Sequence, residues 1–358
     1  MLLDLSGPPA NPSSVHWFGQ QARNHLANAR LKTASFFEAK PEEILFTSGG
    51  TESINFLLRG LKPKSHVITT SIEHAAIYQT LQALESTHGF HVTYLPMTRW
   101  GAPLPEQILD AIRPETSAII LSASNGETGV KIDLEAIAAI AEKKGILLFI
   151  DAVSYIGKEP FLRHRGIAAI ALSGHKFHAP KGIGALYLRS DIKIVPEITG
   201  GSQENARRAG TENLAGILGL AEALQILQEN QTEITRTLLD LRLHLENGLI
   251  RAIPDLIIHG EAQRVSNTSN IAFLGIDGET LLIQLDLAGI AVSNGSACSS
   301  GSIEPSRVLT NMGIDRKTAR SSIRFSVSRM NTREEMDLVI ERTAQIVKKL
   351  KKALNPPI

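Results

Sequence analysis

Short, mainly apolar runs alternate with helical patterns through the first half of this chain, which leaves few folds open to it. The runs lie at residues 42–46, 67–70, 91–96, 118–123, 145–150 and 167–172. Helical patterns such as those at 53–61 and 134–144 separate them. Strands that alternate with helices at this spacing indicate a mainly parallel sheet with both faces covered. We therefore predict an α/β fold whose functional residues gather along one edge of the sheet.

A lysine follows the last of these runs. The run at 167–172 leads into Ser-Gly-His-Lys, which ends at Lys176, and then into a glycine-rich stretch that contains Pro180. A lysine amine at a strand end can form a Schiff base with an aldehyde such as that of pyridoxal phosphate, if other side chains hold the phosphate and the ring nitrogen. The alternative is that Lys176 and Lys181 are solvated loop lysines. Partners elsewhere in the chain decide between the two.

Glycine and threonine follow the run at 42–46. The sequence there is Thr-Ser-Gly-Gly-Thr-Glu, which places Gly50 and Thr51 just before the helical pattern that begins at residue 53. Their backbone N–H groups, the Thr51 hydroxyl and the helix dipole would all point at a phosphate. An ordinary helix cap with a glycine turn fits the same residues. The segment is no Walker loop, because no Gly-Lys-Ser/Thr follows.

Two more polar residues stand at predicted strand ends. Asp151 follows the run at 145–150, and His74 comes shortly after the run at 67–70. A carboxylate beside the pyridine nitrogen of pyridoxal phosphate keeps that nitrogen protonated, although an aspartate in this place is often a turn or cap residue. His74 could stack on a flat ring, transfer protons or serve as a structural histidine.

The last third has a different pattern. Predicted strands at 269–273, 290–292 and 322–327 alternate with helices, as in a compact α+β unit. A long helical region that reaches Leu249, with leucines at helical spacing, would bridge the two parts, and the boundary between the domains would fall near residue 230. We predict a large domain at 13–230 and a small domain at 231–358 together with 1–12.

The only cysteine of the chain is Cys298. One thiol can form neither an internal disulfide nor a cysteine metal cluster, so it is either inert packing or a reagent. Its neighbours from Ser293 to Ser302 are mostly small residues. This composition is typical of an accessible loop, which favours the reactive interpretation.

Overall composition argues against several classes of partner. The 358 residues are 43% hydrophobic and 20% charged, with a formal net charge of +1, so no global field favours nucleic acid or an anionic membrane. No apolar run approaches the roughly 20 residues that a membrane span needs. The N-terminus lacks a basic region followed by an apolar one. We expect a cytoplasmic protein.

Ten segments, taken together and in this order, resemble the pyridoxal-phosphate cysteine desulfurases of the NifS/IscS type in the class V aminotransferase group. They are NPSSxHxxG at 11–19, FTSGGTES at 46–53, EH at 73–74, NGETG at 125–129, DA at 151–152, SGHK at 173–176, RAGTEN at 208–213, SNGSAC at 293–298, EPS at 304–306 and SSIRFS at 321–326. The resemblance implies a fold type I transferase: a large domain with a mainly parallel seven-stranded sheet and a smaller α+β C-terminal domain.

The resemblance also implies how the cofactor is held. Its phosphate would be bound by four residues of this chain and by one from the second subunit of a homodimer. These are Gly50, Thr51, Ser173 and His175, with Thr211 from the second subunit. Its ring would be bound by Lys176 through a Schiff base, by Asp151 at the nitrogen, by Asn125 and Ser154 on the hydroxyl side, and by His74 through stacking.

For the reaction, the resemblance implies that Arg324 and Asn125 bind the substrate L-cysteine, the arginine through its α-carboxylate. The amine of Lys176 would remove the α-proton. The thiolate of Cys298 would then attack the substrate sulfur, leaving alanine and a persulfide. Sulfur would pass to an iron–sulfur scaffold or another acceptor protein. No resident metal is expected, and Cys298 would at most be a transient iron–sulfur ligand.

Several positions depart from the family pattern. The N-terminal segment before residue 11 is shorter, Ser154 replaces a glutamine that bonds the ring hydroxyl, and Gly126 replaces an asparagine. His178 and Ala179 replace an aromatic–glycine pair, and Ser328 replaces a glycine. Two alternatives therefore stand beside the desulfurase: a related class V lyase or aminotransferase, for example one acting on selenocysteine, and a cofactor-binding partner subunit with little activity.

Overall fold

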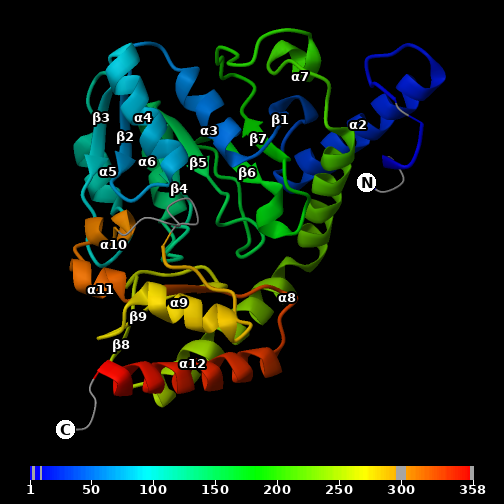
Figure 1. Ribbon diagram of the computed structural model, residues 1–358. Helices are drawn as coiled ribbons and strands as arrows, with labels where there is room; N and C mark the ends of the chain where they lie inside the picture. The colour runs from blue at the N-terminus through cyan, green and yellow to red at the C-terminus, as the bar shows by residue number, and fades with distance from the viewer. Residues whose placement is uncertain (2–4, 9, 296–303, 355–358) are drawn as a thin grey trace.

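The computed structural model describes residues 1, 5–8, 10–295 and 304–354. Ten strands form two sheets in this part of the chain (Figure 1). The strands are β1 (Ile44–Thr47), β2 (His66–Thr70), β3 (His91–Leu95), β4 (Thr116–Ser122), β5 (Leu147–Asp151), β6 (Ile167–Ser173), β7 (Gly184–Leu188), β8 (Leu256–Ile258), β9 (Thr268–Phe273) and β10 (Ser322–Ser326).

The described helices cover these sheets. They are α2 (Trp17–Phe36), α3 (Gly50–Arg59), α4 (Ala75–His88), α5 (Pro105–Ala111), α6 (Leu134–Lys144), α7 (Gln203–Ala206), α8 (Leu214–Ala252), α9 (Gly278–Leu287), α10 (Arg307–Asn311), α11 (Arg316–Arg320) and α12 (Arg333–Leu354), with short 3-10 helices η1 (Pro41–Glu43) and η2 (Gly174–Phe177). None of the helices in the described part of the chain combines the length and apolarity that a bilayer crossing requires.

The large sheet has seven strands in the order β1-β7-β6-β5-β4-β2-β3. Neighbours from β6 through β5, β4 and β2 to β3 pair in parallel, whereas β7 pairs antiparallel with both β6 and β1. Parallel neighbours need crossover connections, which the helices between them supply. The prediction of a mainly parallel seven-stranded sheet is confirmed.

Both faces of this sheet are buried. In β4, Ile119 and Leu121 belong to the apolar layer that includes α2, α6 and α8, whereas Ala118 and Ile120 belong to the layer that includes α3 and α4. Successive side chains of a strand point to opposite faces. A strand covered on both sides therefore needs an unbroken apolar run, which is why these strands were visible in the sequence.

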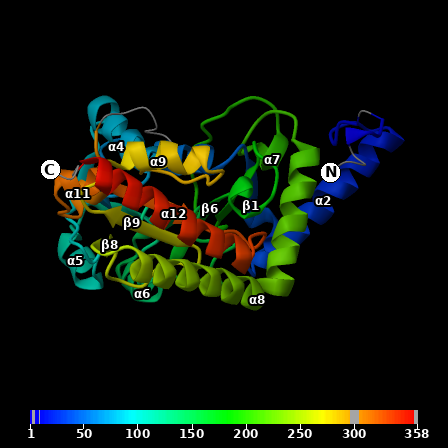
Figure 2. The same cartoon turned by 60° about the horizontal axis from the view of Figure 1, so that its bottom comes forward.

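Helix α8 joins the large sheet to the small one. It packs against α2 near its start and against α12 along its second half (Figure 2), and it continues unbroken through residue 230. The predicted domain boundary at 230 is therefore not marked by a break in the backbone. Met1, predicted to belong with the small domain, lies beside Gly219 in the first half of α8.

The small sheet is antiparallel, in the order β10-β9-β8. The predicted α+β character of the last third is confirmed, but two details of the prediction are wrong. Residues 290–292 form no strand: among the described residues between α9 and α10, Ser293 alone forms a β-bridge, with Arg324. Strand β8 was missed because its apolar run, Leu-Ile-Ile, is only three residues long, and the strand is partly exposed.

Candidate active site

The carboxyl ends of β4, β5 and β6 meet at one edge of the large sheet. Ser122 pairs with Asp151, which in turn pairs with Ala171, two residues before Ser173 at the end of β6. Asp151 and Ser173 are thus the last residues of adjacent strands. The clustering predicted from the sequence is present in the structure.

Lys176 lies in η2, one short turn beyond β6. Burial raises the pKa of Asp151 to about 6, against the opposing effects of the Val153 N–H group and the positive charge of Lys176. Burial and then the charge of Lys176 lower the pKa of His74 and of His175. Lys176 thus acts electrostatically on both Asp151 and His74, which belong to segments far apart in the sequence.

Helix α3 begins with Gly50, and its start faces the end of β6. The hydroxyl Oγ of Ser173 lies 3.1 Å from Nδ1 of His175 and 3.4 Å from where a Cβ would stand on Gly49. A Cβ on Gly50 would come within 2.5 Å of Val153 Cγ2. Only glycine leaves this space open, so the cradle offers backbone N–H groups and the Ser173 hydroxyl to a small anion. The residues present fit a phosphate group.

Asp151 fits the other end of the cofactor. The residue is 6% exposed, and its carboxylate accepts one hydrogen bond from the described residues, from Val153 N to Oδ1 at 2.9 Å. A buried carboxylate with so few donors is poorly satisfied. A protonated pyridine nitrogen would supply the missing donor.

His74 caps helix α4. Its Nδ1 accepts a hydrogen bond from Ala76 N at 3.1 Å. Because an accepting ring nitrogen carries no proton, the neutral ring is protonated at Nε2. Burial lowers the pKa of His74, which favours this neutral, flat form.

Asn125 and Ser154 were also predicted to contact the cofactor. Asn125 Oδ1 accepts hydrogen bonds from Glu127 N and Thr128 N, and Asn125 Nδ2 donates to Ile72 O at 3.0 Å. An amide nitrogen carries two hydrogens, so one remains for a ligand. The hydroxyl of Ser154 lies 3.0 Å from where a Cβ would stand on Gly126. The roles predicted for Asn125 and Ser154 toward the cofactor stay predictions.

Arg324 reaches this edge from β10 of the small sheet. Its Nη1 donates to Gly126 O at 3.0 Å. Its Nε is buried and has no hydrogen-bond partner among the described residues. A buried guanidinium with an unused donor fits a carboxylate ligand.

Cys298 lies outside the described residues, but the residues that flank its segment are anchored at the site. Ser293 pairs through its backbone with Arg324, and Ser306 Oγ donates to Glu127 Oε2 at 2.5 Å. Among the described residues, no three His, Cys, Asp or Glu side chains are grouped so that they could hold a metal ion.

Arg307, which the sequence reasoning missed, grips the loop that carries His74. Its guanidinium donates to the carbonyl oxygens of Ser71 and Glu73 and lies 4.2 Å above the ring of Tyr78. The carbonyl of Glu73 belongs to the peptide bond of His74 itself. No local pattern could have revealed this contact, because the partners are more than 230 residues apart in the chain.

Glu73 was also missed, although its neighbour His74 was identified. Its buried carboxylate accepts hydrogen bonds from Thr70 Oγ1 at 2.7 Å, Ser122 N at 3.0 Å and Ser122 Oγ at 2.6 Å. Burial nevertheless raises the pKa of Glu73 to about 7, and nearby Asp151 contributes to the rise. The site thus holds two buried acids, one at the end of β5 and one in the loop after β2, with β4 between these two strands.

Glu73→Gln is expected to change how stability depends on pH. Because the pKa of Glu73 rises from 4.5 to about 7, the folded protein keeps a proton that the unfolded chain loses. Its contribution to stability is therefore full below pH 4.5 and is lost as the pH rises to 7. The difference in unfolding free energy between wild type and variant should change by about 3 kcal/mol across this window, measured by urea unfolding. Parallel curves would contradict the assignment.

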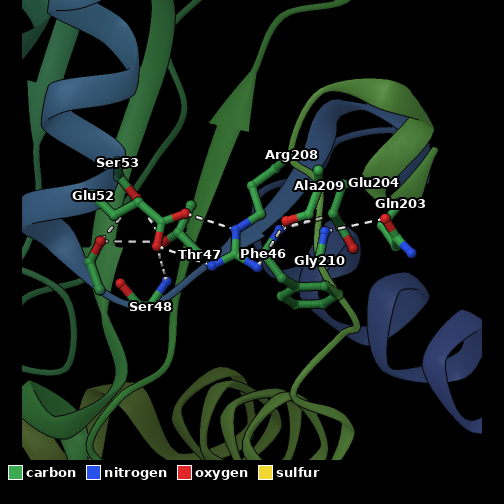
Figure 3. A network of polar contacts seen from close by, with 11 residues as sticks. Phe46, Thr47, Ser48, Glu52, Ser53, Gln203, Glu204, Arg208, Ala209 and Gly210 are labelled. Atoms are coloured by element: carbon green, nitrogen blue, oxygen red, sulfur yellow. Dashed lines mark hydrogen bonds and ion pairs between the residues drawn. The ribbon is translucent and has the colours of Figure 1, made fainter. Parts of the chain in front are cut away.

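The loop that carries Thr211 is clamped to the start of α3 (Figure 3). Arg208 Nε donates to Glu52 Oε1 at 2.9 Å, and Ser48 N donates to Glu52 Oε2 at 2.8 Å. Burial would raise the pKa of Glu52, but hydrogen bonds from Arg208 and Ser48 outweigh it and lower that pKa. Thr211 itself is exposed and lines a cavity of about 170 Å³ with Ser48 and Gly182. Its predicted reach into a second subunit stays a prediction.

The fold and the site define a class, that of the fold type I pyridoxal-phosphate transferases. A lysine beyond one strand end, an aspartate at the next and a glycine-rich helix start carry that assignment. Residues 5–339 match the family model described as Aminotransferase class-V. The chain is 42% identical to cysteine desulfurase IscS of Methanosarcina thermophila over 348 residues, which is 95% of this chain and 86% of that protein.

Solved structures of NifS-like proteins and related enzymes have the same fold as this chain. A structure described as a NifS-like protein has a TM-score of 0.90 and 35% identity, covering 98% of this chain and 94% of its own. A structure of SspA in complex with cysteine has a TM-score of 0.77 and 32% identity, covering 90% of this chain and 92% of its own. The chain therefore belongs to the class-V aminotransferase family, among its cysteine desulfurases.

Proposed function

We propose that this chain is a pyridoxal-phosphate-dependent cysteine desulfurase that converts L-cysteine to L-alanine and takes the sulfur onto Cys298 as a persulfide. One observation carries the proposal: Lys176, Asp151 and His74 meet beside a glycine cradle that fits a phosphate. The SspA structure, which resembles this chain over most of its length, contains cysteine. That likeness supports L-cysteine as the substrate.

Different residues at this edge of the large sheet would hold the phosphate and the ring of the cofactor. The phosphate would rest on Gly50, Thr51, Ser173 and His175, and the ring would lie between His74 and Asp151. When bound, pyridoxal phosphate would supply an electron sink for the substrate α-carbon. Asp151 would maintain the proton on the ring nitrogen on which that sink depends.

Side chains of the protein would bind the substrate, remove its α-proton and accept its sulfur. Arg324 would hold the α-carboxylate with its unused Nε donor. Lys176 would bind the cofactor aldehyde and, once the substrate amine has displaced it, would take the α-proton. The Cys298 thiolate would attack the substrate sulfur: an S–S bond forms, the substrate C–S bond breaks, and its electron pair stays with the carbon that a proton then completes as alanine.

The proposal includes partners. A homodimer would let Thr211 of one subunit complete the phosphate site of the other. Val15 and Trp17 are 85% and 65% exposed. Exposed apolar side chains of this kind favour an interface with another protein chain, which supports the proposed dimer. An iron–sulfur scaffold or another acceptor would collect the sulfur, and the protein would act in the cytoplasm.

Cys298→Ala tests the reaction. Sulfide release from L-cysteine should fall at least about 10²-fold, because the attacking thiolate is gone. Cofactor binding, followed by the visible absorbance band, should be unchanged. The measurement is sulfide assay together with mass spectrometry of residue 298 in the wild type. Release that survives the substitution would favour a related lyase such as one acting on selenocysteine. A wild type that binds the cofactor but forms no persulfide would favour a partner subunit.

A further inference from the structure

A second lysine, Lys158, lies directly beneath the loop of Lys176. Its side chain is buried, at 9% exposure. The amine Nζ donates to the backbone carbonyl of Lys176 at 2.7 Å and to that of Ile156 at 3.0 Å. Its target is thus the backbone of the very residue proposed to bind the cofactor.

The neighbouring glycine makes this approach possible. Gly157 adopts φ +84°, a left-handed conformation that favours glycine. A Cβ on Gly157 would stand 2.6 Å from the Cβ of Phe177, the residue after Lys176. The loop of Lys158 therefore packs against the lysine loop with no room for a side chain between them.

The other side of Lys158 is attached to the C-terminal part of the chain. Its backbone carbonyl accepts hydrogen bonds from Thr235 Oγ1 of α8 at 3.0 Å and from Ser266 Oγ at 2.7 Å. Ser266 lies two residues before β9, which pairs with β10 and so with Arg324. Lys158 thus connects the Lys176 backbone to the sheet that carries Arg324.

We propose that Lys158 is a positioning residue that fixes the Lys176 backbone relative to the small sheet, so that the cofactor-binding amine and the Arg324 guanidinium face the same substrate. The inference rests on the proposed function and deepens it. Lys158 touches neither cofactor nor substrate in this role. It acts through the carbonyl of Lys176.

The protonation state of Lys158 is compatible with this role. Burial lowers the pKa of Lys158 to about 7, and the positive charge of Lys176 contributes to the shift. A neutral amine has two N–H bonds, one for each of the two carbonyls that it contacts. Both protonation states therefore keep the hydrogen bond to Lys176.

Lys158→Met tests the inference, because methionine keeps the apolar stem and removes the donor. The matched control is Lys131→Met. Lys131 pairs with Glu159 at 2.8 Å in the same junction, and neither this ion pair nor the hydrogen bond from its backbone N to Gln263 O involves the lysine loop. Each protein is mixed with pyridoxal phosphate, sampled over time into borohydride, and examined by peptide mass spectrometry for cofactor fixed on Lys176. Activity is measured in parallel as kcat and KM for L-cysteine.

Lys158→Met is expected to slow covalent attachment to Lys176 about tenfold, because the Lys176 carbonyl loses a buried hydrogen bond, and to lower kcat by a similar factor. Lys131→Met should stay within about twofold of wild type. A merely structural role would lower the melting temperature without slowing attachment, and that result would overturn the inference.

Thr235→Val keeps the test decisive if Lys158→Met does not fold, because it removes only the hydroxyl that holds the Lys158 carbonyl. Attachment should then slow about threefold, and an unchanged rate would count against the inference. Failure of the proposed function has a different outcome, since a wild type that never attaches cofactor to Lys176 would reject that function before any variant is compared.

Discussion

Lys176→Ala is expected to leave a folded protein that can no longer bond pyridoxal phosphate covalently. Borohydride treatment should fix no cofactor on the chain, and turnover of L-cysteine should fall at least about 10³-fold, because one side chain serves as both the attachment point and the proton acceptor. The fold should tolerate the change, since Lys176 is exposed. Its carbonyl, which Lys158 grips, is still present in the variant.

Lys181→Ala is the matched control for that experiment. It removes a lysine from the same loop, also exposed, five residues further on. Attachment and turnover should remain within about twofold of wild type. Cofactor fixed by borohydride to another residue of the Lys176→Ala protein, with turnover retained, would show that Lys176 is not the attachment point.

Asp151→Asn is expected to have opposite effects on stability and activity. Burial raises the pKa of Asp151 from 3.8 to about 6, so the ionised carboxylate costs stability at about pH 7.5. The neutral amide removes this cost, and the cofactor-free variant should be more stable by on the order of 1–3 kcal/mol. Activity should fall about 10²-fold, because the ring nitrogen loses the negative charge that keeps it protonated.

Urea unfolding of the cofactor-free proteins and steady-state kinetics of the loaded ones measure the two effects. Asp133→Asn is the control, since Asp133 caps α6 by accepting from Ala136 N, and asparagine caps a helix about as well. Both properties should be close to wild type in that control. Loss of stability together with activity in Asp151→Asn would mean that the carboxylate supports the fold rather than the cofactor.

The sequence revealed those parts of the site that depend on local pattern. Asp151 and Ser173 end strands that are buried on both faces, and buried strands require unbroken apolar runs that can be read directly. Helix α6 was predicted with its observed bounds, because Asp133 caps its start and Gly145 ends it in a left-handed conformation. The resemblance to the desulfurases supplied roles that no pattern could.

What the sequence could not reveal are the contacts between distant segments. Lys158 looks like any loop lysine until the structure places its amine on the Lys176 carbonyl, 18 residues away. His178 and Ser328, two separate departures from the family pattern, lie 3.3 Å apart between Nε2 and Oγ, at 150 residues' separation. Neither pair has a periodicity or a spacing that a single chain could display.

Helix α8 has a consequence for any attempt to divide this protein. It spans 39 residues, about 58 Å at the usual rise, and four leucines of its second half are buried. These are Leu238, Leu241, Leu245 and Leu249. A cleavage near residue 230 would divide α8 and leave each fragment with an uncovered apolar helix face. Separately expressed fragments should therefore aggregate, and neither half is expected to fold as an independent domain.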